Sequence, residues 1–168
     1  MSCHRCGRTH EVSFFAKSTF CPGCSTAITF EDLTIAANAS RPVDIRGKLT
    51  VKPGITLTSP LVVCTDAVIE GRLAGAIFCE RRLEIRGNGR LTFRVQAATI
   101  RILKGVELSC TVPLEAGEIE VAGSLVGHLR TRHAKVTKTG LVHGDIDASA
   151  VIVERGGEWI GHGRVGAA

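Results

Sequence analysis

VAGSLVGHLRTRHAKVTKTGLVHGDIDASAVIVERGGEWIGHGRV, residues 121–165, repeats a short pattern of apolar, polar and glycine residues. Three copies carry it: VAGSL at 121–125, VHGDI at 142–146 and the less regular IGHGRV at 160–165. Side chains alternate between the two sides of an extended chain, so a repeat at every second residue predicts β-strands. No apolar spacing of three and four residues extends over two turns, so helices are not expected.

Weaker copies of this pattern fill the middle of the chain, at residues 43–49, 69–73 and 85–91. The glycines of successive copies lie about 18 residues apart, which is the length of one solenoid turn. A single turn cannot bury its own apolar residues, but stacked turns form one continuous core. We therefore predict an all-β fold, a β-solenoid (β-helix) of about seven turns over residues 43–168.

The sharpest local motif is a pair of CxxC sequences near the start of the chain. Cys3 and Cys6 form the first pair, and Cys21 and Cys24 form the second. Two residues between thiolates let both sulfurs reach one ion, and two such pairs make a closed tetrahedral site. The prediction is a structural Zn²⁺ in a small zinc ribbon over residues 1–32.

Inside this ribbon we expect a hairpin between residues 11–15 and 18–20, followed by a third strand at 27–30. His4 and His10 are alternative metal ligands. A redox dithiol is a further alternative, but the surrounding βαβ pattern of such proteins is missing. So small a unit depends on its metal, which supplies on the order of 10 kcal/mol of folding free energy.

Residues 33–42 (LTIAANASRP) are mostly small and polar, and they predict a linker between ribbon and solenoid, with a paired strand at 33–35 as an alternative. Seven cysteines, an odd number with four in the CxxC pairs, argue for metal binding and free thiols in a reducing compartment. No apolar stretch approaches the length of a signal segment or a membrane span. A cytoplasmic protein is expected, with any contact to a membrane made through partners.

Catalysis is not indicated by any motif in the sequence. We find no paired carboxylates, no Ser-His-Asp order and no phosphate-binding glycine loop in a supporting context, so we expect no enzyme. An alternative is a metal site made by His143 and His162, each of which precedes a repeat glycine and is expected to stack outward on neighbouring turns. The formal net charge of +5 is a mild basic excess, and its short charge runs predict a solvated face.

The residues GSLVGHLR (123–130), VTKTGLVHGDI (136–146) and VIVERGG (151–157) resemble the bactofilins, a bacterial family of polymer-forming cytoskeletal proteins. The turn GLVHGDIDA (140–148) is similar to that family's recurring G-x-V-x-G-x-I-x-A turn. The resemblance implies a right-handed β-helix that assembles end to end, without nucleotide, into homopolymeric filaments. Such filaments are scaffolds for cell-shape or envelope proteins.

The resemblance also implies that the ends of the solenoid form the polymer interfaces, because strand edges and core residues there lack a neighbouring turn. At the C-terminal end we expect Trp159 and Ile160 to form a polymer interface, with a simple cap at Trp159 as the alternative. The expected counterparts at the N-terminal end are Val43, Ile45, Leu49 and Val51.

The chain departs from the family at its start, where a zinc ribbon stands in place of a disordered tail or membrane-targeting segment. The ribbon is expected to cap the first turn or to recruit a partner. The alternative function is an adaptor in which the ribbon binds nucleic acid or protein and the solenoid is a spacer. Its basic residues Arg5, Arg8 and Lys17, set against Glu11, are a faint footprint for nucleic acid.

Overall fold

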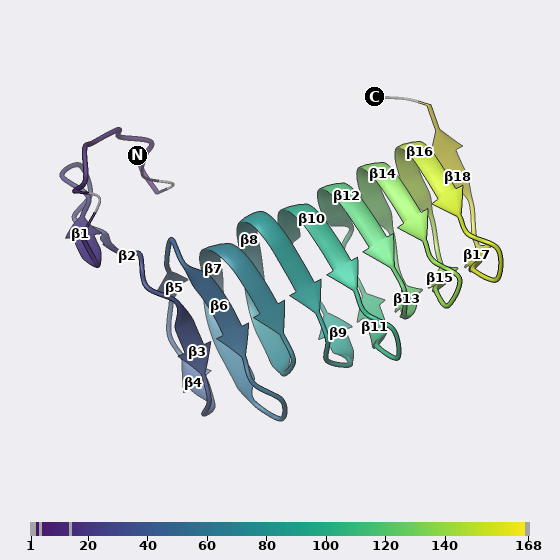
Figure 1. Ribbon diagram of the computed structural model, residues 1–168, viewed down its shortest axis with the longest axis horizontal. Helices are drawn as coiled ribbons and strands as arrows, with labels where there is room; N and C mark the ends of the chain where they lie inside the picture. Colours follow the sequence, from purple (N-terminus) through teal and green to yellow (C-terminus); the bar gives the residue numbers. More distant parts are fainter. Residues whose placement is uncertain (1–2, 4, 14, 167–168) are drawn as a thin grey trace.

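A computed structural model describes residues 3, 5–13 and 15–166, and in these residues every regular element is a β-strand. The strands stack into a rod, with the N-terminal unit at one end and the C-terminus at the other (Figure 1). The all-β class and the β-solenoid are thereby confirmed. None of the described residues forms a helix long and apolar enough to cross a membrane.

Each turn of the solenoid contributes to three flat faces, which we name A, B and C. The two longest strands pass around two corners and belong to all three faces, and four strands of eight residues belong to both C and A. The strands of the rod are β3 (Leu33–Ile35), β4 (Ala39–Ser40), β5 (Val43–Asp44), β6 (Lys48–Val51), β7 (Thr56–Ile69), β8 (Arg72–Ile85), β9 (Gly89–Leu91), β10 (Val95–Ile102), β11 (Glu107–Cys110), β12 (Leu114–Val121), β13 (Ser124–Val126), β14 (Leu129–Val136), β15 (Leu141–His143), β16 (Ile146–Val153), β17 (Glu158–Ile160) and β18 (Gly163–Val165).

Parallel pairing between successive turns defines the faces. Face A comprises residues 33–35, 48–51, 66–69, 82–85, 99–102, 118–121, 133–136 and 150–153. Face B comprises 39–40, 56–58, 72–74, 89–91, 107–110, 124–126, 141–143 and 158–160. Face C comprises 43–44, 61–64, 76–79, 95–97, 114–116, 129–131, 146–148 and 163–165.

The rod has about eight turns rather than the seven predicted. The additional turn comes from residues 33–40, which we expected to be a linker: β3 pairs with β6, and β4 pairs with β7. The period also varies. Along face A the register steps by 19 residues from Ile100 to Ile119 but by only 15 from Ile119 to Ala134.

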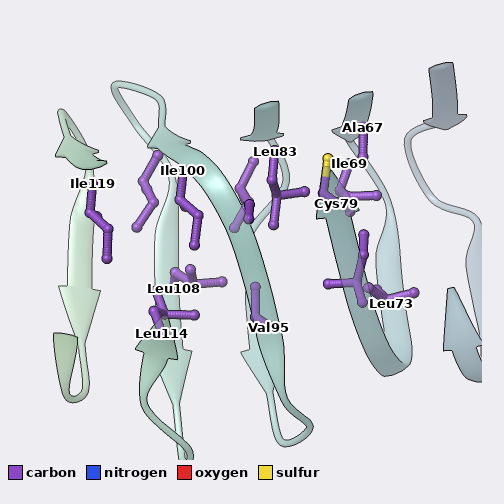
Figure 2. Close-up of a cluster of buried hydrophobic side chains, with 14 of the residues drawn as sticks. Ala67, Ile69, Leu73, Cys79, Leu83, Val95, Ile100, Leu108, Leu114 and Ile119 are labelled. Atoms are coloured by element: carbon purple, nitrogen blue, oxygen red, sulfur yellow. The ribbon is translucent and has the colours of Figure 1, made fainter. Parts of the chain in front are cut away.

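The core is a set of aliphatic ladders, in which the same inward position is apolar in turn after turn. Figure 2 shows part of it, with Leu83, Ile100 and Ile119 on successive turns of face A. These three side chains are at most 1% exposed. Close packing of Ile, Leu and Val between sheets leaves little room for aromatic rings, which agrees with the 4% aromatic content.

Outward positions carry charges of alternating sign. On face A the register runs Glu84, Arg101, Glu120, Lys135, and Arg101 Nη2 lies 3.2 Å from Glu120 Oε2. Lys135 Nζ lies 2.9 Å from Glu154 Oε1, and this contact raises the pKa of Lys135. The short charge runs in the sequence therefore belong to a solvated surface, as expected.

The N-terminal unit contains one antiparallel hairpin, made by β1 (Ser18–Phe20) and β2 (Ala27–Thr29). The predicted hairpin between residues 11–15 and 18–20 is wrong, because 18–20 pairs with 27–29 and the described residues 11–13 and 15 form no strand. On its other side β2 bridges the solenoid, since Thr29 pairs in parallel with Ile45. One strand is thus shared between the N-terminal unit and the first turn on face C.

Candidate functional sites: a cysteine cluster and the solenoid ends

The four cysteines of the CxxC pairs meet in one cluster. The Sγ atoms of Cys3, Cys6, Cys21 and Cys24 all lie within 4.8 Å of one another. Cys3 Sγ is 3.7 Å from Cys24 Sγ, and Cys6 Sγ is 3.5 Å from Cys21 Sγ. Four thiolates around a tetrahedral ion with Zn–S bonds of about 2.3 Å lie about 3.8 Å apart, so the cluster fits such an ion.

Polar groups around the cluster favour the thiolates of Cys21 and Cys24, and hydrogen bonds lower the pKa of both. The amide of Gly23 donates to Cys21 Sγ at 3.4 Å. The Thr26 hydroxyl lies 3.2 Å from Cys24 Sγ, and this hydrogen bond lowers the pKa of the Cys24 thiol to about 6. Deprotonated sulfur is the form that binds a metal. Four cysteines that could hold a metal ion are therefore present, with His10 outside the cluster; His4 lies outside the described residues.

In the described part of the chain, the C-terminal end of the rod has no covering strand on any of the three faces. Val153, Trp159 and Val165 occupy the inward ladder position of the last strand on faces A, B and C. Val153 is 41% exposed and Val165 is 57% exposed. Their register partners one turn earlier, Val136 and Ala148, are 0% and 3% exposed. Among the described residues no further turn packs on these strands, which accounts for the difference.

Outward positions of this last turn are also apolar. On face A the charged ladder ends where Lys135 pairs with Ile152, which is 59% exposed. On face B the outward residue Ile160 is 53% exposed. The outer backbone edges of residues 150–153, 158–160 and 163–165 have no strand partner in the described part of the chain. Apolar side chains beside free strand edges are the features of an association surface.

Trp159 covers the interior of its own turn. Its indole Nε1 donates to the carbonyl oxygen of Gly144 at 3.0 Å. Its ring packs so closely on the chain at Gly163 that a Cβ there would lie 2.2 Å from the ring. Trp159 packs against the core and is half-buried. One side of the ring is therefore engaged within the chain, and its remaining surface belongs to the open end.

The N-terminal end is covered. Val43, Ile45, Leu49 and Val51 are all buried, with at most 5% of each residue exposed. Leu49 and Val51 lie beneath β3, and Ile45 lies beneath Thr29 of β2. Ile45, Leu49 and Val51 therefore lie one layer inside the rod, Val43 is buried in β5, and β3, β4 and the N-terminal hairpin form the outer layer. A second copy can reach them only after this layer moves away.

The hairpin β1–β2 terminates face C at this end. Because β1 runs antiparallel to β2, the parallel ladder of face C does not continue beyond Thr29. Ile28 is fully buried in the small core that includes Cys3 and Cys21. On faces A and B, by contrast, β3 and β4 keep one edge without a strand partner among the described residues. The two ends of the rod thus differ in how much apolar surface they expose.

The expected stacking of His143 and His162 is wrong. His143 is in register with Val126 and Ile160, whereas the backbone N–H of His162 donates to Asp145 Oδ1 at 3.1 Å. The two histidines therefore occupy different columns of the repeat. Among the described residues the only convergent group of metal-binding side chains is the cysteine cluster.

The charge of the N-terminal unit gives no added support to the nucleic-acid alternative. Lys17 Nζ lies 3.1 Å from Glu31 Oε1, and Arg5 donates to the Thr26 hydroxyl at 3.3 Å. Two of the three basic side chains on which that alternative rests therefore have polar partners within the unit.

Sequence reasoning found the cysteines but missed Val153, Val165 and Ile152. Their burial depends on which turn is last, and an interior turn carries similar residues.

Comparison with known proteins returned no match to a curated protein and none to a solved structure. Residues 14–113 match the family described as "Bactofilin: Polymer-forming cytoskeletal", a structural family rather than an enzyme family. The β-solenoid and this match over more than half of its length place the chain in the bactofilin family of polymer-forming cytoskeletal proteins.

Proposed function

We propose that this chain is a non-enzymatic scaffold that self-assembles end to end, without nucleotide, and that the first joint forms between two C-terminal ends. The observation that supports it most is the exposure of Val153 and Val165, whose register partners one turn earlier, Val136 and Ala148, are buried. A second chain placed on this end buries three apolar positions and pairs three strand edges at once.

Two C-terminal ends that meet make a symmetric, closed joint, so filament growth requires a second joint at the N-terminal ends. There the free edges of β3 and β4 are available, but face C is blocked by the hairpin β1–β2. We infer that the N-terminal unit is a zinc ribbon that acts as a cap and limits elongation. Recruitment of cell-shape or envelope proteins by the ribbon is compatible with this role.

Filaments of the purified, full-length protein are the direct test of this function. We expect negative-stain electron microscopy without nucleotide to show short filaments, because one joint is strong and the other is partly covered. Adding ATP or GTP should change neither their number nor their length, since no phosphate-binding loop was identified. Particles that stay monomeric over the micromolar range would contradict the scaffold function and leave the adaptor alternative in its place.

The metal content of the ribbon is a separate prediction. We expect about one zinc ion per chain by elemental analysis of the purified protein, because four thiolates at this spacing make a closed site. The Cys6→Ser, Cys21→Ser double variant should lose the metal, whereas Cys110→Ser should retain it, since Cys110 lies in the solenoid core. Full metal content in the double variant would exclude this site.

The compartment we propose is the cytoplasm. All seven cysteines are free, and a cluster of four thiolates with three further thiols is stable where thiols are kept reduced. Any contact of the filament with a membrane would be made through partner proteins.

A further inference from the structure

Face B of the solenoid is interrupted at one place. Its strands 72–74 and 89–91 belong to successive turns, yet they do not pair: the five-stranded sheet of face B ends at β9, and residues 72–74 pair only with 56–58. The same two turns remain paired on the other faces, where Ile69 is in register with Ile85 and Ile77 with Val95. The turns therefore separate on one face while staying joined on either side of the gap.

A core side chain is missing at the same place. The inward position of face B is filled in other turns by Leu57 and Leu73 before the gap and by Leu108 and Leu125 after it. In the turn between them, the residue in register with Leu108 is Gly89. A Cβ built on Gly89 would have no atom within 4 Å, and Gly89 itself is exposed. An inward position of the ladder is thus open space.

The gap opens into a cavity of about 540 Å³. Its walls are core residues of several turns, and Figure 2 shows five of them. They are Ile69, Leu73, Leu83, Val95 and Leu108. Pockets for small molecules commonly span about 300–1,000 Å³ and combine apolar walls with a few polar groups. Both the size and the lining of this cavity fall within that description.

The charged groups at this cavity are two arginines, and the polar residues Thr56 and Asn88 also line it. Arg72 and Arg90 line it from the two strands that fail to pair, and both side chains are on exposed residues. Several arginines elsewhere on the rod have acidic partners, such as Arg94 with Glu115 and Arg101 with Glu120. Within the described part of the chain no ion pair involves Arg72 or Arg90. Two guanidinium groups beside an apolar cavity favour a ligand with an anionic head.

We propose that this cavity binds the aliphatic chain of a free single-chain fatty acid, with its carboxylate between Arg72 and Arg90. The apolar walls bury the chain, which stabilises the complex roughly in proportion to the apolar area removed from water. The guanidinium groups hold the carboxylate at the mouth by charge-assisted hydrogen bonds. The site lies in the middle of the rod, away from the ends that form joints, so binding does not depend on polymerisation.

Isothermal titration of the full-length protein with dodecanoate, below its micelle concentration, tests this site. We expect saturable binding of about one molecule per chain. Gly89→Leu should weaken binding at least about tenfold because its side chain fills the cavity, and Gly89→Ala should weaken it less. The backbone φ of Gly89 lies outside the left-handed region, so both variants are compatible with the fold. Circular dichroism and thermal unfolding verify that they are folded.

Matched controls distinguish the contribution of the carboxylate head of the ligand from that of its aliphatic chain. Arg72→Gln with Arg90→Gln should weaken dodecanoate binding about tenfold, whereas Lys104→Gln with Arg155→Gln, on exposed residues outside the cavity, should leave it unchanged. Dodecyltrimethylammonium, with the same chain and a cationic head, should bind much more weakly. No saturable binding, or equal binding by Gly89→Leu, would overturn the proposal. Displacement of dodecanoate only by peptides, or binding only to lipid vesicles, would also overturn it in favour of a different ligand.

Discussion

The Val153→Lys, Val165→Lys variant is expected to form no filaments and to elute as a monomer at concentrations where the unchanged protein polymerises. Each lysine would be buried without a partner in the joint between two C-terminal ends. An unpaired buried charge costs several kcal/mol, and 1.4 kcal/mol corresponds to a factor of ten in affinity. We therefore expect at least a hundredfold loss in affinity, roughly, measured by light scattering coupled to gel filtration.

The fold of this variant should be preserved, because both valines are already 41% or more exposed in the single chain. Val126→Lys is the matched control: Val126 is 53% exposed, but it points outward in the middle of face B. Its filaments should be unaffected. Filaments of normal length in the Val153→Lys, Val165→Lys variant would show that the joint lies elsewhere on the rod.

Trp159 is a poorer position at which to test the joint, although the sequence predicts it as part of the polymer interface. The indole bonds to Gly144 and its ring packs on Gly163, so Trp159→Glu would disturb the turn itself. Loss of filaments in that variant would not distinguish a broken joint from an unfolded end. Ile160→Lys is cleaner, since Ile160 is 53% exposed and points outward.

The repeat made the solenoid predictable, but not its first turn. Strands at 121–165 show alternation and regular glycines, and both are local signals. Residues 33–40 carry one alternating pair, Leu33 and Ile35, among small polar residues. They become strands because β6 and β7 offer paired edges, and no local pattern contains that contact. The predicted start of the solenoid at Val43 therefore left β3 and β4 outside it.

The cysteine cluster was predictable because the spacing of the two CxxC pairs by itself indicates a metal site with four thiolate ligands. The cavity at Gly89 was not. In the sequence, Gly87-Asn88-Gly89 looks like another corner of the repeat. Only the register with Leu108 shows that Gly89 stands where a core side chain belongs. A missing side chain in a ladder has no signature in one sequence, since glycine is also the usual residue of a tight turn.

Removing the metal is expected to lengthen the filaments several-fold. The Cys6→Ser, Cys21→Ser variant keeps the whole solenoid but should lose the ribbon, because a unit of this size has little core beyond Ile28 and Phe30. Without β1 and an ordered β2, the edge at Ile45 on face C becomes free, together with the edges of β3 and β4. The N-terminal joint can then engage all three faces, as the C-terminal joint does.

Filament lengths in electron micrographs decide this prediction, with Cys110→Ser as the control for the loss of a thiol outside the cluster. The chelated, full-length protein should behave like the double variant, and adding zinc back should shorten its filaments. Filaments that disappear when the metal is removed would mean that the ribbon forms part of the joint and does not cap it. Lengths that stay the same would mean that the outer layer at β3 and β4, and not the ribbon, governs the N-terminal end. Because the C-terminal valines are untouched in every one of these samples, any change in length reports on the N-terminal joint alone.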